Sequence, residues 1–341
     1  MKLLSRLVGS RRRGLAQGPL VVGLLVAFGC SLPALAQEDS RAVRLPSQKP
    51  ISVASEVGIG DLYALVVGVA QYRNPKVPKL NFSDKDARAF AEFLSSQKSL
   101  FRKIHLTLLV NEQASQQEVK KHLFYELRRA GKNDTVVLFF AGHGLDDPNQ
   151  PGEFFFMTHD ADPDFLEATA VNMTRSPFMQ RLDSKRVVAI ADTCYAGGFS
   201  SQGARSIDSS LNKLINQFKE SEGRVFLSSC RPDQISKEAP ELSSGVFTYY
   251  FLEGLKGKAD SNGDGVVTLQ EAYEYVYGKA KDHTRGGQHA QLAGQFVGAF
   301  PLSVVGRREG TPPASASPGA DTGFSPGGNG GPLAVYGRIG S

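Results

Sequence analysis

A histidine and a cysteine, each close to glycines, are the residues of this 341-residue sequence that could perform chemistry together. His143 lies in the run Ala-Gly-His-Gly, and Cys194 lies in the run Asp-Thr-Cys-Tyr-Ala-Gly-Gly. A cysteine becomes a nucleophile when a nearby base or cation favours its thiolate, and a histidine within hydrogen-bonding range does this at neutral pH. Adjacent glycines let the backbone turn sharply, so that N–H groups can face a developing oxyanion. The pattern predicts a nucleophile and its base rather than a buried structural cysteine and a turn histidine.

These two residues can meet only if the segments before them are neighbouring strands of one sheet. Short hydrophobic runs predict five strands, at 62–69, 105–110, 135–140, 186–191 and 224–227. Helical spacing predicts helices over 84–95 and 115–130. Near-continuous hydrophobic strands that alternate with helices indicate an α/β fold, with a mostly parallel central sheet and helices on both faces. His143 and Cys194 follow the third and fourth strands, and sites in such sheets form beyond the carboxyl ends of the strands.

The same segments carry a resemblance to the caspase family of cysteine peptidases, in its bacterial metacaspase-like form. The similar stretches are 63–69, 84–87, 140–144, 192–198 and a small-subunit-like region from 245 to 276. The His and Cys motifs are the specific part, and they lie about 50 residues apart, as in caspases. The Gln-Ala-Cys signature of animal caspases is absent. The resemblance covers essentially the whole predicted domain and implies a caspase-like sandwich.

Carried over motif by motif, the resemblance implies a role for each residue of the site. Cys194 would be the nucleophile and His143 the general base and acid, and the N–H groups of Gly144 and Cys194 would form the oxyanion hole. The reaction would be hydrolysis of a peptide bond through an acyl-enzyme, for which no cofactor is required.

The resemblance also implies which residue precedes the cleaved bond. Metacaspases cut after Arg or Lys, and the matching pocket positions are Asp86, Asp160 and Asp192. A cationic side chain in a partly dry pocket needs at least one carboxylate. Asp86 could instead be a charge that stabilises a helix N-terminus. Ser228 and Ser229, after the fifth strand, would contact the peptide backbone.

A further motif, at 260–271, fits a calcium-binding EF-hand loop. Its ligand positions would be Asp260, Asn262, Asp264, Val266, Thr268 and Glu271. The alternative is a turn rich in Asp, Asn and Gly, followed by a capping box that Thr268 and Glu271 form at the start of a helix. Ca²⁺ is thus a possible ligand that the chemistry does not require.

Residues 1–36 are typical of an export signal. They contain five basic residues and no acidic ones, an apolar run over 19–28, and small residues at Ala34 and Ala36. The three arginines at 11–13 are compatible with either the general secretory or the twin-arginine route. We expect a bacterial periplasmic or secreted protein with no stable membrane insertion after signal removal. The remaining chain has 34 Lys and Arg against 34 Asp and Glu, so no nucleic-acid partner is implied.

The rest of the chain divides into a linker at 37–57, one peptidase domain at 58–306, and a disordered Gly/Pro/Ser-rich tail at 307–341. The polar stretch 200–224 is either a site of self-cleavage or an uncleaved amphipathic connector. Cys230 is interpreted as a bystander, although an oxidising compartment could join it to Cys194.

These observations predict a monomeric, exported cysteine endopeptidase that acts on proteins or peptides with basic residues. Two alternatives remain open. One is a peptidase of related fold that prefers Asn or Asp, and the other is a non-catalytic caspase-like module that binds partners.

Overall fold

The computed structural model describes residues 60–146, 150, 152–175, 178–195, 207–219, 221–296 and 298–305; for residues 194, 195 and 207–211 it describes the backbone alone. The predictions of an export signal at 1–36, a linker at 37–57 and a disordered tail at 307–341 lie outside the described residues. No helix in the described ranges is long and apolar enough to cross a membrane.

The centre of the fold is a sheet whose main path has the strand order β11-β7-β6-β3-β1-β2. These strands are β1 (Leu62–Gly68), β2 (Ile104–Val110), β3 (Thr135–Asp146), β6 (Arg186–Tyr195), β7 (Arg224–Ser228) and β11 (Gln291–Gln295). All neighbouring pairs from β7 to β2 are parallel, and β11 is antiparallel to β7. Two short strands, β4 (Phe154–Phe156) and β5 (Val171–Asn172), continue from the end of β3. The five predicted strands and the mostly parallel sheet are confirmed.

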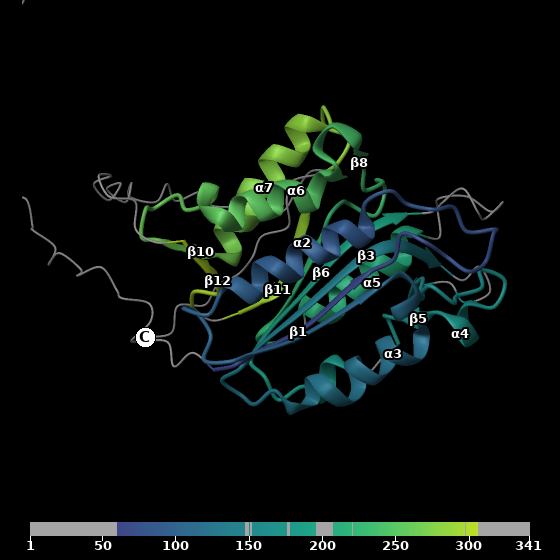
Figure 1. The fold of residues 1–341 in the computed structure, drawn as a ribbon, viewed down its shortest axis with the longest axis horizontal. Helices are drawn as coiled ribbons and strands as arrows, with labels where there is room; N and C mark the ends of the chain where they lie inside the picture. Colours follow the sequence, from purple (N-terminus) through teal and green to yellow (C-terminus); the bar gives the residue numbers. More distant parts are fainter. Residues whose placement is uncertain are drawn as a thin grey trace, which may run out of the picture. The chain divides into compact units, whose positions relative to one another are not determined.

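Helices cover both faces of this sheet (Figure 1). One face carries α2 (Ser83–Ser96), α6 (Val246–Glu253) and α7 (Leu269–His283). The other carries α3 (Gln116–Lys121), which continues through a π-helical turn (His122–Glu126) and a 3₁₀ turn (Leu127–Arg129), and α5 (Ile207–Lys219). Each face has its own hydrophobic core, with Phe90 and Phe251 in the first and Leu123 and Phe218 in the second.

Smaller elements complete the described residues. Two strand pairs stand apart from the main sheet: β8 (Glu238–Ala239) with β9 (Ser244–Gly245), and β10 (Val266–Thr268) with β12 (Pro301–Val304). The short helix α4 (Leu166–Thr169), 3₁₀ turns at 111–113, 179–181 and 240–242, and a π-helical turn at 254–258 lie in the connections.

Strands β3 and β6 extend beyond the hydrophobic runs that predicted them. The runs ended at 140 and 191, but the paired register continues to Gly144 and Tyr195. The expectation that the glycines open a turn directly after the strand is therefore wrong for the His motif. Glycine is needed there for close packing instead, because a Cβ on Gly144 would lie 2.6 Å from the ring of Phe154.

Candidate functional site

Strands β3 and β6 bring the predicted nucleophile and base into register. His143 is the direct partner of Cys194, and Ala141 is the partner of Asp192. Residues two apart on a strand belong to the same face of a sheet. Positions 192 and 194 therefore share a face, next to positions 141 and 143 of the neighbouring strand. The pairing lies at the carboxyl end of the parallel strands, where sites of this fold class form.

The imidazole of His143 is buried and held from two sides. Its Nε2 lies 3.0 Å from the carbonyl oxygen of Pro78. A carbonyl can only accept a hydrogen bond, so Nε2 carries the hydrogen, and in the neutral ring Nδ1 is the atom that can take a proton. The ring of Tyr72 stacks on the imidazole with centroids 5.2 Å apart.

Tyr72 also fixes the backbone of the histidine. Its hydroxyl accepts a hydrogen bond from the His143 N–H at 2.8 Å and donates to the carbonyl of Val69 at 3.2 Å. Neither Tyr72 nor Pro78 was predicted from the sequence, because the irregular segment between β1 and α2 has no spacing that would point to them.

The amide of Gly144 is oriented towards β6. The N–H of Met157 donates to the carbonyl of His143 at 2.9 Å, which makes Gly144 and Phe156 a non-hydrogen-bonded pair of the antiparallel β3–β4 ladder. The Gly144 N–H therefore points away from β4, to the side on which Cys194 and Tyr195 lie. In the β3–β6 ladder this N–H faces the backbone of β6, so the oxyanion role of Gly144 stays a prediction.

The carboxylates of Asp86 and Asp192 meet at Gly245. Both aspartates are about 95% buried, with 4% and 5% of their surface exposed. Asp86 accepts hydrogen bonds from the Ser244 hydroxyl and, at 2.9 Å, from the Gly245 N–H. A Cβ on Gly245 would lie 3.0 Å from an oxygen of each aspartate. Two carboxylates from α2 and β6 thus converge on one point.

Hydroxyl groups surround Asp192 in the same way. The Ser236 and Thr248 hydroxyls each donate to one of its oxygens at 2.6 Å. Sequence analysis missed these donors because they come from the segment before β8 and from α6, far along the chain from Asp192. The two acids are therefore covered by the protein's own donors.

Burial raises the pKa of both acids, and the charge of Asp192 raises that of Asp86 further. Burial and the nearby charge of Asp192 raise the pKa of Asp86 to about 7, against the opposing effect of the hydrogen bonds from Ser244 and Gly245. Burial likewise raises the pKa of Asp192 above its ordinary value. Two ionised carboxylates this close repel one another unless a cation joins them.

The third predicted pocket carboxylate, Asp160, lies elsewhere. One oxygen accepts hydrogen bonds from the Gln116 N–H and the Thr158 hydroxyl, both at 2.8 Å. It therefore binds the first turn of α3, on the face of the sheet opposite to the one that α2 covers. The structure does not bring Asp160 together with Asp86 and Asp192.

The end of β7 is interior in this conformation. Ser228 donates to the Cys230 carbonyl at 2.8 Å, and Ser228 and Ser229 are both buried. Their contact with a peptide backbone stays a prediction. Burial raises the pKa of the Cys230 thiol to about 12. That thiol donates to the Gln234 carbonyl at 3.4 Å, which agrees with its interpretation as a bystander.

The EF-hand-like loop has the alternative structure that the sequence allowed. Thr268 and Glu271 form a capping box at the start of α7. The other Glu271 oxygen accepts from the Ser261 N–H and hydroxyl, while Asp260 accepts from the Gly263 and Gly265 N–H groups. Within the described ranges, no three His, Cys, Asp or Glu side chains form a group that could hold a metal ion. In this conformation the Glu271 and Asp260 carboxylates bind the protein's own donors, and Ca²⁺ binding stays a prediction.

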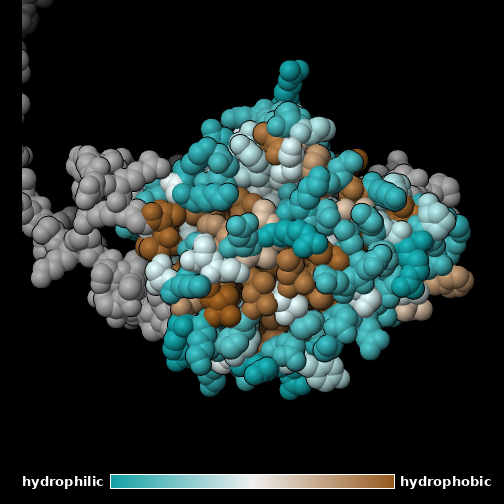
Figure 2. Space-filling model, in the orientation of Figure 1, coloured by the Kyte–Doolittle hydropathy of each residue, from teal (hydrophilic) through white to brown (hydrophobic). Residues whose placement is uncertain are grey.

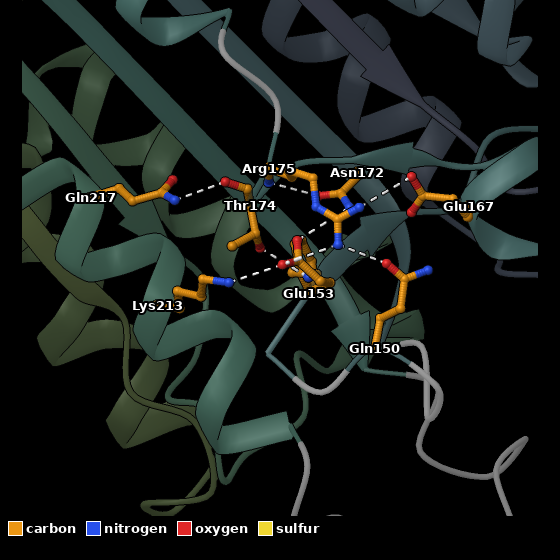
Figure 3. A network of polar contacts seen from close by, with 9 residues as sticks. Gln150, Glu153, Glu167, Asn172, Thr174, Arg175, Lys213 and Gln217 are labelled. Atoms are coloured by element: carbon orange, nitrogen blue, oxygen red, sulfur yellow. Dashed lines mark hydrogen bonds and ion pairs between the residues drawn. The ribbon is translucent and has the colours of Figure 1, made fainter.

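The connector after the nucleophile strand contains a well-anchored helix. Lys213 of α5 forms an ion pair at 2.9 Å with the buried Glu153, which lies just before β4. Figure 3 shows Asn172 and Arg175 reaching the same carboxylate from β5 and the residues after it. Gln217, one turn further along α5, donates to the Thr174 carbonyl at 2.8 Å.

The chain has matches among family models and among solved structures. The family model described as caspase domain matches residues 61–296. A crystal structure of a Geobacter sulfurreducens protein aligns with 16% identity and a TM-score of 0.49, and the alignment covers 69% of this chain and 94% of that protein. No curated protein matches the sequence significantly.

Proposed function

Because the chain belongs to the caspase-domain family of cysteine peptidases, we propose that it is an endopeptidase that cleaves after Arg or Lys. The observation that carries the proposal is the register pair His143–Cys194 at the carboxyl end of β3 and β6. The hydrogen bond from Nε2 to Pro78 supports it further, since it leaves Nδ1 as the basic atom of the ring.

In the proposed reaction, His143 Nδ1 takes the thiol proton of Cys194, and the thiolate attacks the carbonyl carbon of the peptide bond. The N–H groups of Gly144 and Cys194 stabilise the oxyanion. The C–N bond then breaks, and the departing amine receives the proton from Nδ1. A water molecule gives its proton to Nδ1 and attacks the acyl-enzyme, the C–S bond breaks, and the thiol recovers its proton.

The acidic pair supports a basic residue before the cut. Arg carries five N–H donors in a planar fork that suits carboxylates, and Lys carries three. A bound cation would replace the hydroxyl donors that now cover Asp86 and Asp192, and it would relieve the repulsion between the two carboxylates. Among the described residues, neither carboxylate interacts with a basic side chain. Binding a cation is thus the role that best fits these two buried acids.

Two further features of the proposal concern processing and location. Residues 1–36 would direct export to the periplasm or the medium, by the charge and apolar pattern of the sequence. Self-cleavage between 200 and 224 would fall before α5, because a peptidase needs an extended substrate and residues 207–219 are helical. The basic residue available there, Arg205, lies outside the described residues.

The test is hydrolysis of fluorogenic peptides that end in Arg, Lys, Asp or Asn, with the Cys194→Ala variant as the control. Gly245→Ala serves as the pocket variant. The backbone of Gly245 has φ −63° and ψ 139°, which alanine adopts without strain, so the added methyl group acts on the two aspartates alone. We expect turnover of Arg and Lys peptides, none in Cys194→Ala, and a reduced kcat/KM in Gly245→Ala.

Other outcomes would select the alternatives. Preference for Asn or Asp would keep the His–Cys pair and overturn the role of the acidic pocket. A folded chain that cleaves none of the peptides, before or after trypsin treatment, would favour a non-catalytic module that binds partners.

A further inference from the structure

A second surface feature, away from the His143–Cys194 pair, has the character of a binding site. A groove of about 600 Å³ runs along α3 and its continuation, on the face opposite to α2. It begins beside Gln116, and Arg181 contributes from the 3₁₀ turn at 179–181. Parallel strands β2 and β3 end at the same edge of the sheet, and five residues separate the end of β2 at Val110 from the start of α3 at Gln116. The groove therefore starts at the edge that carries His143.

The charged side chains that line this groove are all positive. Four cations line it, namely Lys120, Lys121, Arg128 and Arg181, and no Asp or Glu does. Lys121 forms an ion pair with Glu118. Among the described residues, no carboxylate forms an ion pair with any of the other three cations. Three positive charges without a partner thus face one concave surface, which favours an anionic ligand.

Two adjacent aromatic side chains lie among these cations. Phe124 is partly buried against the core, and Tyr125 has 70% of its surface exposed, more than any other large hydrophobic residue in the described ranges. Both belong to the π-helical turn His122–Glu126. Both side chains line the groove. The surface over α3 is largely hydrophilic (Figure 2).

We propose that this groove binds a polypeptide segment in which acidic side chains alternate with apolar ones. The distance from Gln117 to Arg128 is about 17 Å along a helix, the length of about five residues in an extended peptide. Carboxylates of the segment pair with Lys120, Arg128 and Arg181, and its apolar side chains lie on Phe124 and Tyr125. A peptide is favoured over a nucleic acid because residues 37–341 are formally neutral and the positive charge is confined to this short groove.

This inference does not rest on the proposed function, since binding is measured on the full chain with Cys194 replaced by alanine. The probe is a fluorescein-labelled octapeptide of alternating Glu and Leu, observed by fluorescence anisotropy. The reference probe has Gln in place of Glu. We expect the acidic probe to bind, the Gln probe to bind at least about tenfold more weakly, and the affinity to fall with added NaCl.

Two sets of variants locate the binding. The groove set combines Lys120→Glu, Arg128→Glu and Arg181→Glu, and we expect it to lose about tenfold or more in affinity. The control set combines Lys98→Glu, Lys103→Glu and Lys132→Glu. These three lysines are exposed, they form no ion pair within the described part of the chain, and their replacement changes the net charge equally. The control set should retain binding. Tyr125→Ser, which changes no charge, should weaken it.

Thermal unfolding of every variant shows whether the fold is kept. If the groove set does not fold, the affinity of the Tyr125→Ser variant decides the test. The proposal is overturned if the acidic probe does not bind, or if the control set weakens binding as much as the groove set. It is equally overturned if a ten-nucleotide oligothymidylate binds the same groove more tightly than the peptide.

Discussion

The hydrogen bond between His143 Nε2 and the Pro78 carbonyl gives the two nitrogens of the ring different roles. Nε2 is held as a donor, so proton transfer belongs to Nδ1. Tyr72 adds a second constraint, because its hydroxyl is the acceptor for the His143 N–H and its ring stacks on the imidazole. The base is therefore positioned by a segment that contributes no reacting group.

Replacement of Tyr72 by phenylalanine should slow catalysis without weakening substrate binding. The ring remains, but the buried N–H of His143 loses its acceptor, which costs about 1–3 kcal/mol. We expect kcat to fall by about tenfold while KM changes little. The matched control is Tyr63→Phe on β1, whose ring stacks on His105 instead. An unchanged kcat in Tyr72→Phe would show that the hydroxyl does not position the base.

The acidic pocket predicts a pH dependence in the binding of basic ligands. Asp86 has a pKa of about 7, so protons compete with a cationic side chain below neutral pH. A peptide aldehyde ending in Arg should bind more tightly as the pH rises through 7, with release of a proton. Isothermal titration calorimetry of the Cys194→Ala variant, in buffers of different ionisation enthalpy, measures both effects without the thiol titration.

The control for this titration is Asp86→Asn, in which the change of affinity near pH 7 should flatten. If the wild-type affinity is independent of pH between about 5.5 and 8.5, then the ligand does not contact Asp86, and the assignment of the basic-residue pocket fails.

At the scale of elements, α5 is joined to the β4–β5 region by one buried carboxylate. Burial raises the pKa of Glu153, but the hydrogen bonds from Lys213 and Asn172 and the nearby charges outweigh it and lower the pKa below 4.5. The folded state thus favours the ionised form, and the resulting stabilisation is complete at neutral pH. It is lost as the pH falls through the folded-state pKa.

Lys213→Ala should lower the free energy of unfolding by about 1 kcal/mol at pH 7, because it leaves the Glu153 carboxylate without its shortest partner. Lys219, at the end of the same helix, forms no ion pair with any residue that the structure describes, so Lys219→Ala serves as the control. Urea unfolding at pH 7 and pH 3.5 measures the difference. The deficit should shrink at the lower pH, and an equal deficit at both values would rule out the ion pair as its cause.

The helices and strands also show which parts of the fold sequence patterns could predict. Strands and long helices follow hydrophobic periodicity, so β1, β2, β7 and α2 appear close to their predicted positions. The extension of β3 and β6 was not predictable, because Gly142 and Gly144 have low strand propensity and are held by pairing with distant segments.

The candidate site also has residues that the sequence could predict and residues that it could not. His143, Cys194 and Asp192 stand in local motifs, and Asp86 stands in the first turn of a predicted helix. Their partners Tyr72, Pro78, Ser236, Ser244 and Thr248 do not, because these contacts join segments far apart in the chain. Asp160 was misplaced because a carboxylate that binds a helix N-terminus and one that lines a pocket look alike in sequence.

At the scale of the whole molecule, calcium binding would change the stability of the fold. An ion that binds only the folded state stabilises the entire fold. Here Glu271 is shared between the capping box of α7 and Ser261, and Asp260 is bonded to the loop backbone. An EF-hand would need these groups to leave their partners and converge. The structure therefore predicts a molecule whose stability does not depend on calcium.

Thermal unfolding with about 1 mM CaCl₂, MgCl₂ or EDTA should give the same Tm, because no preformed group of ligands exists in this loop. Thr268→Ala should lower the stability by about 1 kcal/mol in all three solutions, since it removes one half of the capping box. A rise in Tm of several degrees that is specific to calcium and absent in Glu271→Gln would contradict this prediction. It would mean that the loop exchanges its capping hydrogen bonds for metal ligands, and that α7 begins differently in the calcium-bound protein.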